Sequence, residues 1–163
     1  MSETVQSQDG AHDFDFFFGR WKIHNRRLVK RLEGCQDWDE FEATAECKPI
    51  LGGLANIDDY FTDYWKDFVG MSLRFFNVET GQWRIYWADN RRTLGDMEAP
   101  VVGRFVDGVG IFEGPDTFNG KPIIVRYTWS DITPTSAQWA QAFSPDNGKT
   151  WETNWVNTFT RVE

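Results

Sequence analysis

The carboxylates of this sequence are its best candidates for acid–base chemistry, because histidine and cysteine are scarce. The two histidines, His12 and His24, do not have the spacing of a metal-ligand set, and neither do the two cysteines. Asp89 and Glu152 each lie close to a tryptophan, whose ring would exclude water from the carboxyl group and favour its protonated form. They are therefore the candidate catalytic residues, as proton shuttles, and we expect no metal and no cofactor.

Binding of a small molecule is a second kind of chemistry that the pattern indicates. Tryptophan alternates with amide or charged residues along four segments, which are residues 82–89, 122–130, 136–144 and 150–162. A ligand cavity combines apolar walls with a few polar groups in this way, whereas a solid core with outward polar residues is the alternative. An arginine on these segments would hold a ligand carboxylate or neutralise a nearby acid. The predicted ligand-binding residues are Arg74, Trp87, Arg126, Trp139, Gln141, Asn154 and Trp155.

The segments that carry these residues have the alternation of β-strands. In residues 41–48, Phe41, Ala43, Ala45 and Cys47 share one face and polar residues share the other, which indicates a half-buried strand. Further strands are expected at 20–32, 56–62, 70–77, 82–89, 101–106, 110–114, 122–130, 136–144 and 150–162. On any of them a β-bulge would exchange the inner and outer faces.

Short turns join most of these segments, including VETG, DGV and PDNGK, so neighbouring strands should be antiparallel. Closure of such a sheet removes its exposed edges, and few connections are long enough for Greek-key crossings. The predicted fold is all-β: a single antiparallel up-and-down β-barrel of about 8–10 strands. Residues 1–10 are expected to be a disordered tail and residues 11–163 the barrel domain, which begins with a short helical turn.

A glycine, a tryptophan and an arginine at the two ends of the domain form a structural motif. Gly19 and Trp21 begin the first strand, and Arg161 lies near the C-terminus. The chain here resembles the calycin superfamily, meaning the lipocalins and fatty-acid-binding proteins. The resemblance implies that the arginine lies across the tryptophan ring and that the ring plugs one end of a barrel. The runs DFDFFFGRW, GQWRIYW and WETNW are most similar to small bacterial lipocalin-like proteins of unknown function.

The segment SPDNGKTW, residues 144–151, matches the Asp-box pattern that sialidases and other propeller proteins carry in several copies. A single copy indicates a structural hairpin rather than a sialidase. Asp146 would accept backbone hydrogen bonds, Gly148 would adopt a positive φ, and Trp151 would pack under the turn.

Composition excludes several partners. The net charge is −8, and the basic residues form only short clusters, so nucleic acid and membrane are not expected. These clusters are Arg26, Arg27, Lys30 and Arg31, and the pair Arg91 and Arg92. The polar first ten residues lack the features of a signal peptide, and no apolar run could span a bilayer, which predicts a cytoplasmic protein with reduced cysteines.

These observations favour an intracellular β-barrel that binds a hydrophobic or aromatic small molecule. The alternative is a cofactor-free enzyme, an isomerase, cyclase or hydrolase, that uses an acid–base carboxylate in the barrel pocket. A third interpretation is a protein-interaction module, for instance a homodimer that pairs through exposed aromatic residues.

Overall fold

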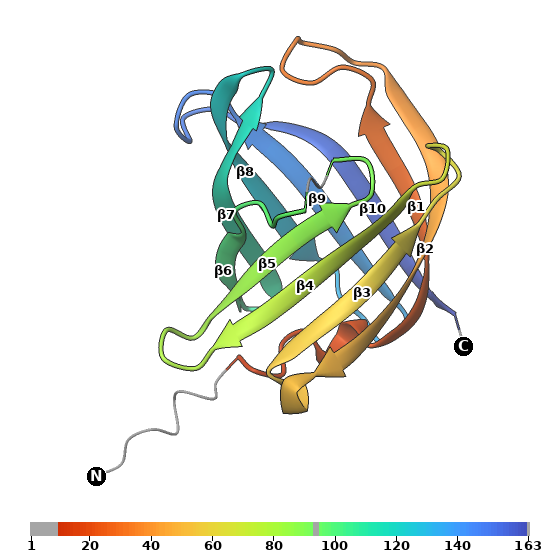
Figure 1. The fold of residues 1–163 in the computed structure, drawn as a ribbon, viewed down its shortest axis with the longest axis vertical. Coiled ribbons are helices and arrows are strands. Elements are labelled where there is room, and N and C mark those ends of the chain that lie inside the picture. Colours follow the sequence, from red (N-terminus) through yellow and green to blue (C-terminus); the bar gives the residue numbers. More distant parts are fainter. Residues whose placement is uncertain (1–9, 93–94, 163) are drawn as a thin grey trace.

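The computed structural model describes residues 10–92 and 95–162, which form a closed antiparallel barrel of ten strands (Figure 1). Each strand pairs with its neighbours in sequence, and β1 also pairs with β10 and closes the barrel. This confirms the predicted up-and-down barrel. The strands are β1 (Gly19–Leu28), β2 (Trp38–Ile50), β3 (Ala55–Phe61), β4 (Val69–Asn77), β5 (Gln82–Asp89), β6 (Val101–Val106), β7 (Val109–Phe118), β8 (Lys121–Ser130), β9 (Ser136–Ser144) and β10 (Glu152–Val162).

Helical structure in these two stretches is confined to short 3₁₀ turns, η2 (Asp15–Phe17) and η3 (Leu51–Gly53). Neither is long or apolar enough to cross a membrane. The helical turn predicted before the first strand is therefore present as η2. The predicted disordered tail, residues 1–10, lies outside the described residues except for Gly10.

The first strand is shorter than its sequence pattern suggests. Strand β1 alternates as predicted, with Trp21, Ile23 and Asn25 buried, but it ends at Leu28 rather than at residue 32. Leu32 has a φ of 60°, and the left-handed backbone conformation does not fit a strand. Residues 29–37 therefore connect β1 to β2 as a loop.

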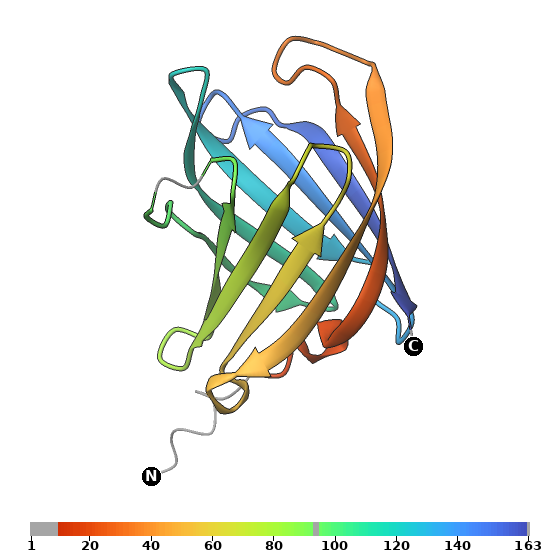
Figure 2. The same ribbon diagram turned by 45° about the vertical axis from the view of Figure 1, so that its right-hand side comes forward.

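One end of the barrel is closed by a group of aromatic side chains, which we call the plug. The N-terminal segment with η2 crosses this end (Figure 2) and brings Phe14 and Phe17 into it. Edge-to-face and tilted ring contacts, with centroids 5.0 to 6.1 Å apart, connect these rings. The plug consists of Phe14, Phe17, Trp21, Trp83, Phe112, Trp129 and Phe159.

Arg161 fastens the plug to the last strand. Its guanidinium lies 4.3 Å from the centre of the Trp21 ring and donates hydrogen bonds to the carbonyl oxygens of Phe18 (2.6 Å) and Phe16 (2.5 Å). Gly19 has a φ of 113°, and a Cβ atom there would lie 2.7 Å from Arg161 Nη1. The three residues of the predicted motif therefore make the contact that the calycin resemblance implies.

A β-bulge in β10 exchanges the two faces of that strand. The register with β9 shifts between Thr153 and Trp155, and the side chain of Asn154 is fully buried. Thr153 is consequently exposed, whereas Trp155 two residues later lines the barrel interior. The bulge therefore places Thr153 and Trp155, which simple alternation would put on one face, on different faces of β10.

The β9–β10 connection has the hydrogen bonds of a structural turn. Asp146 accepts from the backbone N–H of Thr150 (2.8 Å) and from its hydroxyl (2.6 Å), and Ser144 Oγ accepts from Gly148 N (2.7 Å). These bonds lower the pKa of Asp146 to about 2. Gly148 has the positive φ expected, at 92°, and the ring of Trp151 lies 3.9 Å from the position of a Cβ added there.

Candidate functional site

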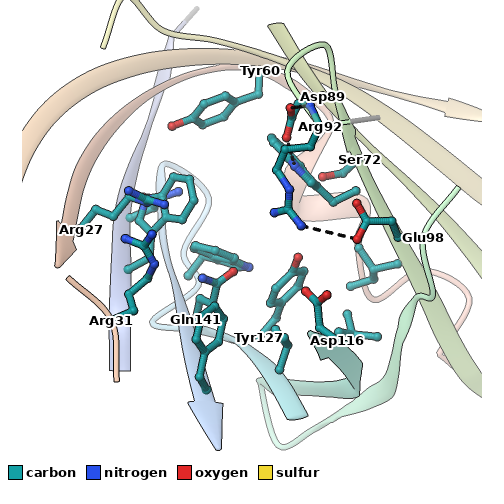
Figure 3. Close-up of a pocket in the computed structure, with 18 of the residues that line it drawn as sticks. Arg27, Arg31, Tyr60, Ser72, Asp89, Arg92, Glu98, Asp116, Tyr127 and Gln141 are labelled. Carbon is teal, nitrogen blue, oxygen red and sulfur yellow. Dashed lines mark hydrogen bonds and ion pairs between the residues drawn. The ribbon is translucent and has the colours of Figure 1, made fainter. Parts of the chain in front are cut away.

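A cavity of about 570 Å³ lies inside the barrel, between the plug and the opposite end. Side chains from β1 and from β3 to β10 line it, and Figure 3 shows a group of them around a central space. We call the end opposite the plug the mouth, which is bordered by Arg27, Arg31, Trp65, Arg91 and Phe118.

Aromatic rings form much of the wall between mouth and plug. Trp139 makes edge-to-face contacts with Tyr127 (5.0 Å) and with Trp155 (5.9 Å) on one side. On the other side Tyr60 makes such a contact with Trp87 at 5.8 Å. Facing aromatic walls of this kind suit a flat or hydrophobic ligand.

Asn25 holds two of these rings in place. Its Oδ1 atom accepts a hydrogen bond from Tyr60 Oη at 2.7 Å and another from Trp155 Nε1 at 2.9 Å. The side chain of Asn25 is fully buried, and its partners come from β3 and β10 on either side of β1. Because both ring orientations are fixed by hydrogen bonds, this part of the wall is formed before any ligand arrives.

Three arginines gather at the mouth on aromatic faces. The guanidinium of Arg27 contacts both Trp65 and Trp155, at 5.2 and 5.0 Å from the ring centres. Arg91 lies 5.3 Å from the centre of the Trp65 ring, and Arg31 lies 5.4 Å from that of Phe118. The ring faces partly compensate the charges, because they carry negative electrostatic potential.

The positive charges of these arginines are unfavourable at the mouth, because the guanidiniums are partly buried and repel one another. Burial lowers the pKa of Arg27 to about 10, and the charges of Arg31 and Arg91 act in the same direction. Burial also lowers the pKa of Arg31. Within the described part of the chain, no carboxylate lies within 4.0 Å of the guanidinium nitrogens of Arg27, Arg31 or Arg91. Among these residues the three positive charges are therefore not neutralised by a carboxylate at ion-pair distance, although Glu152 acts on Arg31 from further away.

The opposite side of the mouth carries charges of both signs. Arg92 faces Arg27 and Arg31 across the space in Figure 3 and lies 3.5 Å from Glu98. Asp116 lies beside the ring of Tyr127 in the same view. The excess positive charge of the mouth therefore lies on the side that carries Arg27, Arg31 and Arg91.

The cavity also has a charged pair next to the plug. Arg74 Nη1 lies 2.6 Å from Asp58 Oδ1, and both side chains are almost completely buried. The Arg74 guanidinium lies 5.2 and 5.1 Å from the ring centres of Phe14 and Phe17, which places it at the inner end of the cavity. Burial raises the pKa of Asp58, whereas the charge and hydrogen bonding of Arg74 act against this rise.

Five of the seven predicted ligand-binding residues line the cavity: Arg74, Trp87, Trp139, Gln141 and Trp155. Arg126 does not, because it alternates with the inward-facing Val125 and Tyr127 on β8. Its guanidinium instead pairs with Glu113 at 2.7 Å and lies 3.8 Å from the ring centre of Trp151 on the outer surface. Asn154 is buried at the bulge, where its Oδ1 accepts a hydrogen bond from Gln141 at 3.0 Å.

The two carboxylates predicted to be catalytic both make local hydrogen bonds. Asp89 lines the cavity, but it accepts from Trp87 Nε1 and from the backbone N–H groups of Arg91 and Arg92, each at 2.9 Å. Glu152 accepts from the backbone N–H of Leu32 at 2.8 Å and is not among the lining residues. Both carboxylates hold connecting segments near the mouth.

Sequence reasoning missed the charged residues that distinguish this cavity. Arg27, Arg31 and Arg91 belong to the short basic clusters, whose small size argues against nucleic acid and membrane as partners. Asp58 occupies an inward position of β3, two residues before the buried Tyr60. A pair of adjacent arginines at the end of a barrel strand is the signal that could have identified the mouth.

Comparison with known proteins supports the fold. No family model and no curated protein sequence matches this chain. Among solved structures, the S-type phycobiliprotein lyase CPES from Guillardia theta is similar, with a TM-score of 0.60 and 11% sequence identity. The alignment covers 100% of this chain and 98% of the lyase. At this level of identity the similarity shows the architecture of the barrel alone.

Proposed function

We propose that this protein binds a small molecule with an aromatic or hydrophobic body and an anionic group. The body would lie among Trp87, Trp139 and Trp155, and the anionic group at the mouth. The cavity volume of about 570 Å³ is within the range of small-molecule sites. The observation that carries the proposal is the cluster of Arg27, Arg31 and Arg91, which has no carboxylate within 4.0 Å among the described residues.

An anion at the mouth would offset an unfavourable arrangement of charge. Arg27 loses hydration against two indole rings and is repelled by Arg31 and Arg91. A ligand carboxylate would relieve this repulsion and accept charge-assisted hydrogen bonds, each of which contributes about 1.5–3 kcal/mol.

Binding is favoured over the enzymatic alternative because of how the predicted proton shuttles are held. A proton shuttle must be within hydrogen-bond reach of the substrate. Glu152 is outside the cavity wall, and Asp89 accepts hydrogen bonds from the loop that follows β5. The formation of a homodimer through exposed aromatic residues stays a prediction.

The structural comparison suggests one class of ligand to test. The similar barrel is that of a phycobiliprotein lyase, and a bilin combines a long conjugated body with carboxylate groups. Such a molecule has the two features that the aromatic wall and the basic mouth would recognise. Biliverdin is therefore a reasonable member of a first ligand panel.

Two matched probes separate the anionic contribution from the apolar one. Biphenyl-4-carboxylate and biphenyl-4-methanol share the same rings and differ in charge. Isothermal titration calorimetry of the wild-type protein should show that the carboxylate binds at least about tenfold more tightly, which corresponds to about 1.4 kcal/mol. The variant Arg27→Gln should weaken carboxylate binding by about tenfold and alcohol binding by less than about twofold.

The variant Arg126→Gln provides the matched control, because it removes the same charge from the outer surface. It should leave the affinities of both probes unchanged. Failure of the wild-type protein to bind either probe or biliverdin would contradict the proposed function. Equal losses for the carboxylate and the alcohol in Arg27→Gln would show that the arginine does not recognise the anion.

A further inference from the structure

The ion pair at the inner end of the cavity is held firmly by its surroundings. Asp58 and Arg74 lie on the adjacent strands β3 and β4, with side chains only 6% and 4% exposed. Arg74 Nη1 also donates a hydrogen bond to Asn56 Oδ1 at 2.8 Å. The rings of Phe14 and Phe17 support the guanidinium from the side of the plug. The pair therefore presents fixed polar atoms to the cavity.

Stability alone is a weak explanation for this pair. A buried ion pair is often no more stabilising than apolar residues of similar volume, because both groups lose their hydration. The raised pKa of Asp58 reflects this loss. In the described residues, Arg74 Nε has no hydrogen-bond partner. A polar pair in an otherwise aromatic wall is better explained by what it would contact inside the cavity.

The two charges limit the group that can bind beside them. A ligand carboxylate would be repelled by Asp58, and a ligand ammonium by Arg74. A neutral group that donates to the carboxylate and accepts from the guanidinium complements both. Ser72 lies directly opposite Asp58 in the β3–β4 register and also lines the cavity, so its hydroxyl could donate or accept there.

We infer that the ligand carries, at its inner end, a neutral group with an N–H donor beside a C=O acceptor, such as an amide or a lactam, which Asp58 and Arg74 hold. This inference rests on the proposed function and adds a second contact point to it. The anionic end lies at Arg27 near the mouth and the amide end lies near the plug. The ligand is therefore elongated, with different polar groups at its two ends and an apolar middle.

A series of three probes tests the inner contact without changing the protein. Biphenyl-4-carboxylate can carry nothing, an acetyl group or a carboxamide at its 4′ position. The acetyl group offers only an acceptor, whereas the carboxamide offers a donor and an acceptor. In calorimetric titrations of the wild-type protein, the carboxamide should bind at least about tenfold more tightly than the other two.

Two variants that each remove one negative charge test whether the gain in affinity from the carboxamide depends on Asp58. Asp58→Asn should abolish the gain from the carboxamide and leave the affinity for the unsubstituted probe within about threefold. Asp116→Asn, at the mouth, should retain the gain. A crystal structure of the wild-type complex should place the carboxamide nitrogen within hydrogen-bond distance of Asp58. If Asp58→Asn does not fold, this structure tests the contact between the carboxamide and Asp58 on its own.

The outcomes separate this inference from the proposed function. Equal affinities for the three probes would overturn the inner amide site and leave the proposed function intact. A carboxamide gain that persists in Asp58→Asn, or a complex with the carboxylate at the plug end, would also overturn it. No binding of any probe or of biliverdin would refute the proposed function itself.

Discussion

Replacement of Trp21 by alanine should strongly destabilise the barrel. The side chain is 1% exposed, and its ring contacts Phe17 and Phe159 with centroids 5.6 and 6.1 Å apart. Truncation of a large aromatic side chain in a core costs about 3–5 kcal/mol. Two further losses overlap with this value: the hydrogen bond from Trp21 Nε1 to the Phe17 carbonyl, about 1 kcal/mol, and the contact with Arg161, about 0.5–1 kcal/mol. We expect a total of about 4 kcal/mol.

Urea unfolding followed by far-UV circular dichroism measures this change. With a slope of about 2 kcal/mol per molar urea, the midpoint should fall by about 2 M. Trp38→Ala is the control, since Trp38 is partly exposed and also stacks on an arginine, Arg26, at 4.8 Å. It should cost less than about 1 kcal/mol.

If Trp21→Ala lowered the free energy of unfolding by less than about 1.5 kcal/mol, or by no more than Trp38→Ala does, the plug would not stabilise the barrel as proposed. Ligand binding offers a second check. Trp21 does not line the cavity, so the folded fraction of Trp21→Ala should bind biphenyl-4-carboxylate with wild-type affinity.

Two ionisable groups on the outer surface, His24 and Asp146, predict opposite pH dependences. His24 lies 2.7 Å from Glu40 and 2.5 Å from Glu42, whose hydrogen bonds raise its pKa. The resulting stability is complete below the ordinary pKa of about 6.5 and is lost as the pH rises through the higher folded-state value. His24→Gln should therefore be less stable than wild type at pH 6, by less than about 1 kcal/mol because the groups are exposed, and equal to it at about pH 9 in urea unfolding. Asp146 has a lowered pKa of about 2, so its contribution is present above about 3.9 and is lost as the pH falls through about 2. Asp146→Asn should be less stable at neutral pH, a difference that vanishes below about pH 2, and an NMR titration of the carboxyl with a midpoint near 4 would contradict this reasoning.

The strands and their order could be predicted because the patterns that define them are local. Alternation in β2 and β5 and the turn sequences between hairpins describe neighbouring residues, whose side chains must point to opposite faces. The contact between Trp21 and Arg161 joins distant residues, but the resemblance to calycins supplied it. These features follow from short-range geometry or from a known motif.

The predictions of the cavity lining were wrong where alternation along a strand does not show which face points into the barrel. The alternation of β8 separates Arg126 from Val125 and Tyr127, yet it does not say which set faces inward. The bulge at Asn154 reverses the faces within β10, and only the pairing with β9 reveals it. Residue types on a strand therefore indicate that a ligand cavity is present, but they do not identify its lining.

Short segments of the sequence are enough to predict a closed antiparallel barrel with an aromatic end, because alternation, turn residues and the motif of Gly19, Trp21 and Arg161 can each be recognised in them. The lining of the cavity depends instead on which distant residues the closed barrel brings together. Arg27 and Arg91 are far apart in the chain, and both contact Trp65 because closure brings the end of β1 and the loop after β5 to one mouth. Asp58 and Arg74 meet because the β3–β4 register pairs Asp58 with Ser72 and Asn56 with Arg74, which makes the two charged residues diagonal neighbours on adjacent strands. Charged residues that are scattered along the sequence therefore lie close together once the barrel is closed.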